Sequence, residues 1–210
     1  MKKCVIFCAG EFKEPIELIE DRDILIAADG GLVHVEALGL VPNVILGDFD
    51  SLGYIPEGAE VHPVEKDDTD CMLAIKKGLE LGCDTFVIYG GLDGERLDHT
   101  LANYQALRYL ADREAVGYLV GRRYLVTVVK NGKISFPSDA KGILSVFCLG
   151  ADARGVTLSG LKYPLEDGAL TSGFPLGVSN HFTGEKAEIS VNDGSLLVMW
   201  DRENGFPERE

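Results

Sequence analysis

Short apolar runs without strict polar alternation constrain the fold of the first half of this chain more than any other feature. The runs cover residues 3–9, 23–28, 43–47 and 84–89. Such runs are typical of strands that are buried on both faces of a parallel sheet. Helix-like segments separate them, at residues 31–40, 69–81 and 96–112. Strands that alternate with helices predict an α/β unit of the doubly wound type.

Capping and apolar spacing within the sequence support the two longer helical segments. Thr69 is a favourable N-cap residue, and Met72, Ile75 and Leu79 follow it at helical spacing. In the second segment the spacing predicts one buried apolar face, made by Leu97, Leu101, Tyr104, Leu107 and Ala111.

The pattern changes near residue 121. Extended runs flank Asn131-Gly132 and again Asp193-Gly194, and each arrangement predicts a β-hairpin. Residues 150–185 are rich in Gly, Ser, Pro and Thr and show no helical pattern, and residues 203–210 are polar and expected to fray. We therefore predict a Rossmann-like α/β domain, mostly a parallel sheet, at residues 1–121. An antiparallel β-sandwich domain is predicted at residues 122–210.

Three acidic motifs follow strand-like runs in the first domain. They are Gly47-Asp48-Phe49-Asp50-Ser51, Lys66-Asp67-Asp68-Thr69-Asp70 and Arg96-Leu97-Asp98-His99. We expect them to meet at one edge of the sheet. Carboxylates gathered there repel one another unless a cation neutralises them, and Mg²⁺ bound through carboxylates and phosphates is the usual neutraliser. Lys66 and Arg96 can hold phosphate oxygens, so the motifs predict metal-assisted phosphoryl-group chemistry.

The metal ligands expected from this pattern are Asp48, Asp50 and Asp70. If their segment is extended, Asp48 and Asp50 would share one face while Phe49 points the other way, and Asp70 falls in the first turn of a predicted helix. Simpler roles remain open, since Asp and Ser also cap turns and a carboxylate suits the positive end of a helix dipole.

Glycine-rich turns add a possible phosphate site. The segment 90–94 contains three glycines between a strand and a helix, where the backbone can approach an anion closely. It matches neither a Walker A loop nor a GxGxxG motif, and a flexible turn explains it equally well. His99 and Asn103 share a face of the following helix, and Asp29-Gly30-Gly31 is another strand-end turn.

Charge and cysteine usage restrict the partners and the compartment. The net charge of −14 argues against nucleic acid and against an anionic membrane surface. No apolar run reaches the roughly 18 residues of a membrane helix, and no signal peptide is recognisable. The cysteines form no CxxC pair, which favours reduced thiols in a cytoplasmic protein. They are Cys4, Cys8, Cys71, Cys83 and Cys148.

As an ordered set, the motifs resemble the thiamine pyrophosphokinase family, and its bacterial members most closely. The matching segments are Ala28-Asp29-Gly30-Gly31, Gly47-Asp48-Phe49-Asp50-Ser51, Lys66-Asp67-x-Thr69-Asp70, Gly94-x-Arg96-x-Asp98-His99-x-x-x-Asn103 and Gly177-Val178-Ser179-Asn180. The resemblance spans both domains. In eukaryotic members a Gln often stands where Lys66 is.

The resemblance implies an ATP:thiamine diphosphotransferase, which transfers pyrophosphate from ATP to the thiamine hydroxyl and yields thiamine diphosphate and AMP. It implies Mg²⁺ as cofactor and a homodimer with a shared active site. The catalytic residues implied are Asp48, Asp50, Asp70, Arg96 and Asp98. The residues implied on the ATP side are Asp29, Gly30, Gly31, Ser51, Lys66, Thr69, His99 and Asn103. Those implied on the thiamine side are Ser179 and Asn180.

Some roles stay open. Asp98 either holds metal or orients the attacking hydroxyl, and Trp200 is expected in a core or an interface rather than on thiamine. A Mg²⁺-dependent nucleotide-sugar transferase is one alternative, but it leaves the Asp70 and Asp98 motifs unexplained. A non-catalytic thiamine or nucleotide sensor is another, but a sensor has no need of the full set of acids.

Overall fold

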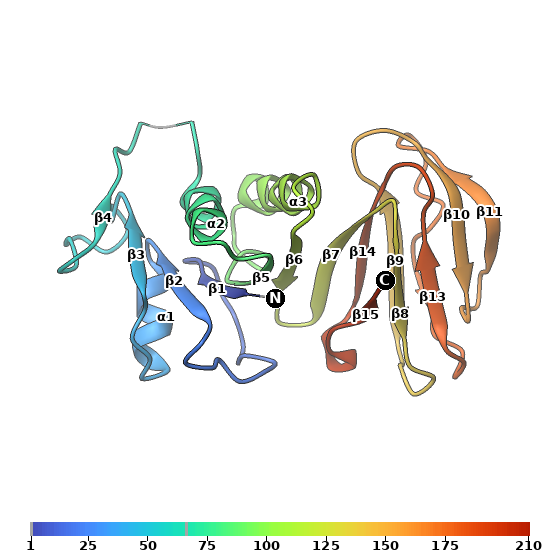
Figure 1. Ribbon diagram of the computed structural model, residues 1–210, viewed down its shortest axis with the longest axis horizontal. Coiled ribbons are helices and arrows are strands. Elements are labelled where there is room, and N and C mark those ends of the chain that lie inside the picture. The colour runs from blue at the N-terminus through green and yellow to red at the C-terminus, as the bar shows by residue number, and fades with distance from the viewer. Residues whose placement is uncertain (1, 66) are drawn as a thin grey trace. The chain divides into compact units, whose positions relative to one another are not determined.

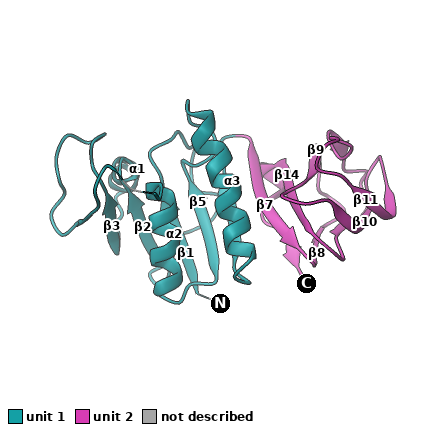
Figure 2. Cartoon of the chain, turned by 90° about the horizontal axis from the view of Figure 1, so that it is seen from above, with its two compact units in different colours: residues 1–122 teal, residues 123–210 magenta. Residues whose placement is uncertain are grey.

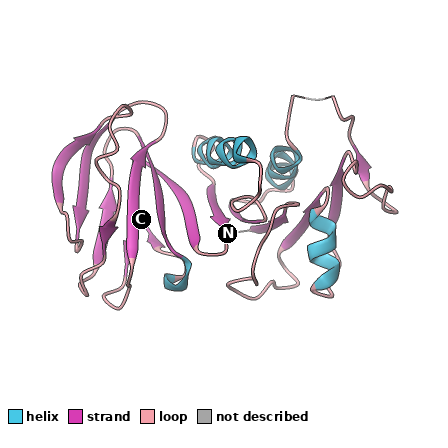
Figure 3. Cartoon of the chain, turned by 180° about the vertical axis from the view of Figure 1, so that it is seen from behind, coloured by secondary structure: helices cyan, strands magenta, loops and turns pink. Residues whose placement is uncertain are grey.

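The computed structural model describes residues 2–65 and 67–210, so Lys66 and its predicted phosphate role lie outside the described residues. The chain divides into two compact units, residues 1–122 and 123–210 (Figure 2). Helices α1, α2 and α3 belong to the first unit, and the second is built from strands and the short 3-10 helix η1 (Arg202–Asn204) (Figure 3). Within the described ranges, no helix is long and apolar enough to span a membrane.

The first unit is built on a parallel sheet with the strand order β6-β5-β1-β2-β3-β4. The strands are β1 (Lys3–Phe7), β2 (Ile24–Ala28), β3 (Val44–Gly47), β4 (Glu60–Val61), β5 (Thr85–Tyr89) and β6 (Val116–Val120). Neighbouring strands pair in parallel throughout. In β1, β2, β5 and β6 every residue after the first one or two is buried, as expected for strands covered on both faces. The predicted α/β fold is confirmed.

The strand order reverses between β1 and β5. From β1 the chain moves outward through β2, β3 and β4, and then returns to β5 on the other side of β1. Ligands of open α/β sheets bind beside the carboxyl ends of the strands at such a reversal. The segments that follow β1, β2, β3 and β5 are therefore the ones placed for a site.

Helices cover both faces of this sheet. The helices are α1 (Gly31–Ala37), α2 (Asp70–Glu80) and α3 (Leu97–Ala111). Figure 1 shows α2 and α3 on one face and α1 on the other. Helix α1 is shorter than predicted because Gly39, at φ +68, ends it. The N–H groups of Gly39 and Leu40 donate to the carbonyls of Glu36 and Val35, which is a Schellman motif.

The apolar face predicted for α3 is only partly buried, since Leu107 lies inside and its N-terminal members do not. Leu97 and Leu101 are 69% and 56% exposed. The buried positions are Thr100, Asn103, Ala106, Leu107 and Leu110. Thr100 and Asn103 turn inward because they donate hydrogen bonds to carbonyl oxygens of the loop before the helix. The hydrogen bonds that Thr100 and Asn103 donate to the loop, and not apolar spacing alone, determine which face of α3 is buried.

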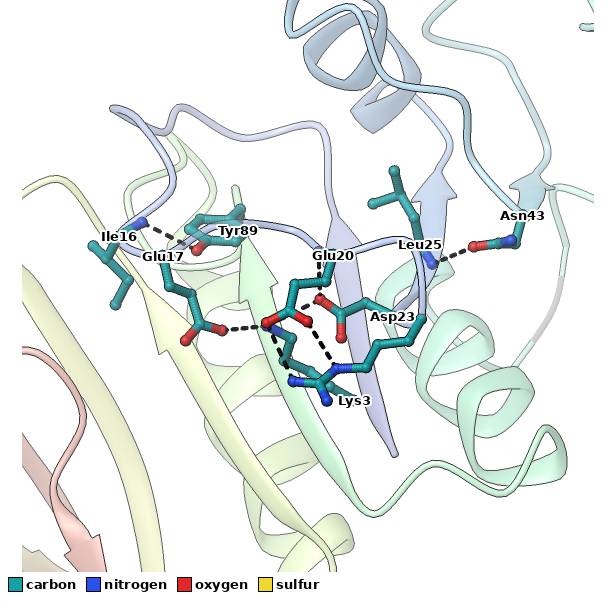
Figure 4. Close-up of polar contacts among 9 residues, drawn as sticks. Lys3, Ile16, Glu17, Glu20, Asp23, Leu25, Asn43 and Tyr89 are labelled. Atoms are coloured by element: carbon teal, nitrogen blue, oxygen red, sulfur yellow. Dashed lines mark hydrogen bonds and ion pairs between the residues drawn. The ribbon is translucent and has the colours of Figure 1, made fainter. Parts of the chain in front are cut away.

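The segment 8–23 between β1 and β2 is held by two partly buried ion pairs to Lys3. Nζ of Lys3 lies 2.7 Å from Oε1 of Glu17 and 3.0 Å from Oδ2 of Asp23 (Figure 4). The Asp23 side chain is only 3% exposed, and its Oδ2 also accepts the N–H of Glu20. Burial opposes the charge of Lys3, but the bonds to Glu17 and Asp23 outweigh it and raise the pKa of Lys3.

The second unit contains antiparallel strands in two groups, ordered β12-β9-β14-β7 and β11-β10-β13-β8-β15. The first group is β7 (Tyr124–Lys130), β9 (Ile143–Cys148), β12 (Asn180–His181) and β14 (Ser195–Asp201). The second group is β8 (Lys133–Phe136), β10 (Ala153–Ser159), β11 (Leu165–Leu170), β13 (Ala187–Ser190) and β15 (Glu208–Arg209). The antiparallel pairing agrees with the predicted β-sandwich.

Neither predicted hairpin forms. The turn at Asn131-Gly132 joins β7, which pairs with β14, to β8, which pairs with β13 and β15. The turn at Asp193-Gly194 likewise leads from β13 in one sheet to β14 in the other. The Gly194 N–H donates to Oδ1 of Asn131 at 2.9 Å, so the two turns support each other. A tight-turn sequence does not specify which sheet the next strand enters.

The core between the two sheets contains Trp200. Its side chain is fully buried, its ring meets Phe136 edge to face with centroids 5.2 Å apart, and its Nε1 donates to the Gly205 carbonyl. The predicted fraying of residues 203–210 is wrong, because β15 pairs with β8. The Arg209 guanidinium also donates to Thr127 Oγ1 and the Val128 carbonyl, which ties down the C-terminal strand.

Candidate active site

Three carboxylates meet at the ends of two neighbouring strands. Asp29 follows β2, and Asp48 and Asp50 follow β3, which pairs with β2. One oxygen from each lies within 4.8 Å of the other two. Asp29 is buried, Asp48 is half-buried and Asp50 is exposed, so the cluster leads from the protein interior to solvent. Asp29 was predicted on the ATP side, and the structure brings it into the predicted metal site.

The backbone bends sharply to form this cluster. Asp29 and Phe49 have φ values of 47° and 59°, a region that residues other than glycine rarely enter. At Gly47, a Cβ atom would lie 3.0 Å from the Asp29 Cα, so only glycine allows the two strand ends to approach so closely. Such conformations cost about 1–3 kcal/mol each and concentrate at functional sites. The cluster is therefore formed at the expense of local strain.

The hydrogen bonding of Asp29 is consistent with a cation at the cluster. Its Oδ2 accepts a 2.6 Å hydrogen bond from Ser51 Oγ. Its Oδ1 is buried and has no hydrogen-bond partner in the described part of the chain. A buried oxygen left in this way costs about 1–3 kcal/mol. A divalent cation held by the three carboxylates removes that cost, and oxygen donors of this kind suit Mg²⁺.

Asp70 approaches the same edge of the sheet from α2. Thr69 caps the helix as predicted, because its Oγ1 accepts the Met72 N–H at 3.2 Å. A hydrogen bond with Cys71, burial and the nearby charge of Asp70 raise the pKa of the Cys8 thiol. Since Cys8 directly follows β1, Asp70 lies near the end of that strand. Within the described residues, Asp70 is not part of the 4.8 Å cluster.

The other acids of the Lys66–Asp70 motif do not join the cluster. Asp68 pairs with Lys76 at 2.6 Å, which gives it a structural partner on the first turns of α2. Lys66 itself lies outside the described residues.

The glycine loop between β5 and α3 is anchored on two sides. Gly90, at φ +69, accepts the Gly10 N–H at 3.1 Å, and a Cβ there would lie 2.3 Å from the Cys8 carbonyl oxygen. On the other side, Asn103 Nδ2 donates to the Gly91 carbonyl at 2.7 Å and Thr100 Oγ1 donates to the Leu92 carbonyl at 3.2 Å. This arrangement fixes the backbone of the loop that leads to Arg96.

Two residues of this region differ from expectation. Asn103 was predicted on the ATP side, but it is buried and its amide holds loop backbone. Thr100 was missed, although a polar pair at i and i+3 within an apolar helix face was a recognisable signal. His99, by contrast, is exposed at the start of α3.

Arg96 and Asp98 form an ion pair at the end of this loop. Nε of Arg96 lies 3.2 Å from Oδ1 of Asp98, and Nη2 lies 2.5 Å from Oδ2. Both side chains are well exposed, at 68% and 64%. The hydrogen bonds from Arg96 lower the pKa of the Asp98 carboxyl below its usual range. An exposed guanidinium beside a glycine loop is suited to bind phosphate oxygens.

Gly30 and Gly31 serve the packing of the strand ends. A Cβ at Gly31 would lie 1.9 Å from the Phe7 carbonyl oxygen, and a Cβ at Gly30 would lie 2.9 Å from the Cβ of Ala9. Close approach of β1 to the start of α1 therefore requires glycine at both positions, and an anion is not needed to explain them.

In the second unit, the Gly177–Asn180 motif organises a loop. Asn180 is buried, its Oδ1 accepts the Tyr163 N–H at 2.9 Å, and its Nδ2 donates to the Tyr163 carbonyl at 2.7 Å. Ser179, at φ 58°, donates its N–H to Ser145 Oγ. The side-chain amide of Asn180 is thus hydrogen-bonded to the Tyr163 backbone rather than left open for a ligand.

Two small cavities flank this loop. One, of about 160 Å³, is lined by residues 146–148 and 170–177. The other, of about 200 Å³, includes Tyr163, Leu176, Val178 and Asn180 in its lining. Tyr163, Leu176 and Val178 are exposed, so the surface at this loop is apolar and partly hollow.

Comparison with known proteins follows the same division into two units. The family model described as the catalytic domain of thiamin pyrophosphokinase matches residues 16–117. The one described as its vitamin B1 binding domain matches residues 132–196. Thiamine pyrophosphokinase from Bacillus subtilis is 29% identical over 189 residues, which cover 86% of this chain and 88% of the relative. Thiamin pyrophosphokinase 1 from Caenorhabditis elegans is 27% identical and covers 78% of this chain and 71% of its own.

Solved structures agree. The crystal structure of the Bacillus subtilis thiamine pyrophosphokinase superimposes with a TM-score of 0.83 at 27% identity, over 94% of this chain and 98% of that one. Thiamin pyrophosphokinase from Geobacillus thermodenitrificans gives 0.76 at 26% identity, over 95% and 96%. Motifs, fold and both matched domains lead to one conclusion: the chain belongs to the thiamin pyrophosphokinase family.

Proposed function

We propose that this chain transfers pyrophosphate from ATP to the thiamine hydroxyl at the carboxyl edge of its parallel sheet, which gives thiamine diphosphate and AMP. The observation that carries the proposal is the Asp29, Asp48 and Asp50 cluster, in which Oδ1 of Asp29 is buried without a hydrogen-bond partner among the described residues. The family comparison supplies the substrates. It does not favour a nucleotide-sugar transferase or a sensor.

Mg²⁺ is the cation we propose for the cluster. Asp29, Asp48 and Asp50 would hold it, and Asp70 would approach from the start of α2. When bound, Mg²⁺ neutralises phosphate oxygens and the charge that develops on the departing AMP. The strained strand ends hold the carboxylates in place before substrate arrives, so little reorganisation is needed.

The ATP side is proposed to include the glycine segment 90–94 and the side chain of Arg96. Thr100 and Asn103 orient this loop, and Arg96 binds phosphate oxygens through charge-assisted hydrogen bonds. Ser51 acts through Asp29, to which it donates a hydrogen bond. The phosphate role of Lys66 and the ATP contact of His99 stay predictions.

Thiamine is proposed to bind at the apolar surface around Gly177–Asn180. Tyr163, Leu176 and Val178 offer exposed apolar surface there for a heteroaromatic ring. Asn180 would contribute by fixing the Tyr163 backbone, and Ser179 lies on the same loop. The remaining proposals are a homodimer with a shared active site and a cytoplasmic location. The cysteines, all present as free thiols, favour that compartment.

A coupled assay for AMP tests this function. AMP release should require ATP, thiamine and Mg²⁺ together. Release of a nucleoside diphosphate from a nucleotide sugar would support the transferase instead. Binding of thiamine or ATP with no AMP release would support a sensor.

A further inference from the structure

Asp98 occupies the Arg96 guanidinium, which is the group proposed to bind the phosphate oxygens of ATP. The guanidinium engages both carboxylate oxygens, through Nε and through Nη2. Two parallel bonds of this kind also describe how arginine binds phosphate. The Asp98 carboxylate therefore fills the position on Arg96 that phosphate oxygens would take.

The loop before the pair is anchored at its start, and the side chains of the pair are exposed. Thr100 and Asn103 hold the Leu92 and Gly91 carbonyls, so the loop is tied to α3. Arg96 is the N-cap residue of α3, and its side chain and that of Asp98 are more than 60% exposed. Rotation about side-chain bonds is enough to separate the pair, and no loop movement is required.

The pair follows a strand that lies close to the strand leading to the carboxylate cluster. It follows β5, whereas Asp29 follows β2, and only β1 lies between these two strands. Two strand spacings amount to about 10 Å. A triphosphate whose metal is held at Asp29 can cross this distance and meet an extended arginine side chain.

We propose that Asp98 keeps Arg96 in a paired state and that the triphosphate of ATP takes its place. Asp98 is then a positioning residue that competes with substrate, and its carboxylate becomes free only after ATP has bound. The direction of exchange follows from charge. An exposed ion pair between arginine and a carboxylate is weak and screened by salt. The triphosphate carries several negative charges and binds the same guanidinium nitrogens. This inference rests on the proposed function.

The proposal predicts an unusual result, because loss of a residue at the site should improve ATP binding. Calorimetric titration of the whole chain with ATP and Mg²⁺, without thiamine, should give an affinity for Asp98→Asn about two- to fivefold tighter than wild type, the range for one exposed ion pair. Asp98→Ser should change the affinity in the same direction. In turnover assays, Asp98→Asn should lower KM for ATP together with kcat, since the released carboxylate is missing.

A matched control separates the pair from general charge. Glu95 is exposed and immediately precedes Arg96, but the pair does not include it. Glu95→Gln removes the same charge, and its ATP affinity should stay within twofold of wild type. In an Arg96→Gln background, Asp98→Asn should not increase ATP affinity at all.

Three outcomes would overturn the exchange. ATP affinity of Asp98→Asn could be unchanged or weaker, the gain could persist without Arg96, or Glu95→Gln could give an equal gain. Each can occur while the wild-type protein still releases AMP, so each leaves the proposed function standing. Failure of the wild-type protein to release AMP would instead count against the proposed function.

Discussion

The Ser51 hydroxyl donates a 2.6 Å hydrogen bond to Oδ2 of Asp29, and so ties the loop after β3 to the end of β2. This bond uses one oxygen of a buried carboxylate and leaves the other, Oδ1, without a hydrogen-bond partner in the described residues. Ser51 thus orients Asp29 within the cluster that it forms with Asp48 and Asp50.

Removing this bond should weaken metal binding. Partners of metal ligands typically change metal affinity by about 10–100-fold when they are lost. We expect Ser51→Ala to bind Mn²⁺ about tenfold more weakly than wild type, measured by calorimetry without ATP or thiamine. Ser51→Thr keeps the hydroxyl and serves as the control. Equal Mn²⁺ affinity in Ser51→Ala and wild type would show that Ser51 does not orient a ligand.

Thr100 should affect ATP use through the glycine loop. Thr100→Val keeps the shape of the side chain but removes the hydrogen bond to the Leu92 carbonyl. A lost hydrogen bond of this kind is worth about 1 kcal/mol, so KM for ATP should rise about fivefold while KM for thiamine changes little. Thr100→Ser should restore the wild-type value. A parallel rise in both KM values would assign Thr100 a purely structural role.

The ion pairs of Lys3 should stabilise the first unit at neutral and mildly alkaline pH, and this contribution should be lost at strongly alkaline pH. The pKa of Lys3 is raised above its ordinary value of 10.5 by Glu17 and Asp23. A raised pKa means that this contribution is complete below pH 10.5 and is lost as the pH rises through the folded-state value. Lys3→Met leaves Asp23 buried without its partner and should lower the free energy of unfolding by about 2 kcal/mol or more at pH 7.

Chemical denaturation from pH 7 to 11 checks this expectation. The difference between wild type and Lys3→Met should shrink at the alkaline end. Lys13 provides a control, because its pair with Glu14 is exposed and contributes little. A constant difference across the range would rule out the charge of Lys3 as the cause.

Sequence reasoning succeeded where the signal is local. Buried runs such as Val5-Ile6-Phe7 indicated the parallel strands, and Thr69 indicated the start of α2 through its own side chain. Asp48 and Asp50 lie in one cluster as expected, but the segment between them is not extended as assumed, because Phe49 has φ 59°.

It failed where the partner is distant in the chain. Leu97 and Leu101 were grouped with the apolar face because the polar pair of Thr100 and Asn103, although recognisable, does not reveal its partners in the preceding loop. The turn at Asn131-Gly132 was read as a hairpin because its sequence carries no information on sheet membership. Asp29 was not placed with Asp48, since their meeting depends on the pairing of β2 with β3.

Turnover of Asp48→Asn tests the central claim most directly. Asp68→Asn is the matched control, because Asp68 pairs with Lys76 and lies outside the carboxylate cluster. AMP release at saturating ATP, thiamine and Mg²⁺ should fall by about 10²-fold or more in Asp48→Asn, a barrier increase of about 2.7 kcal/mol. The melting temperature of the metal-free protein should stay the same or rise, because one of three repelling charges is gone. Near-normal AMP release in Asp48→Asn, or an equal loss in Asp68→Asn, would contradict catalysis at this cluster.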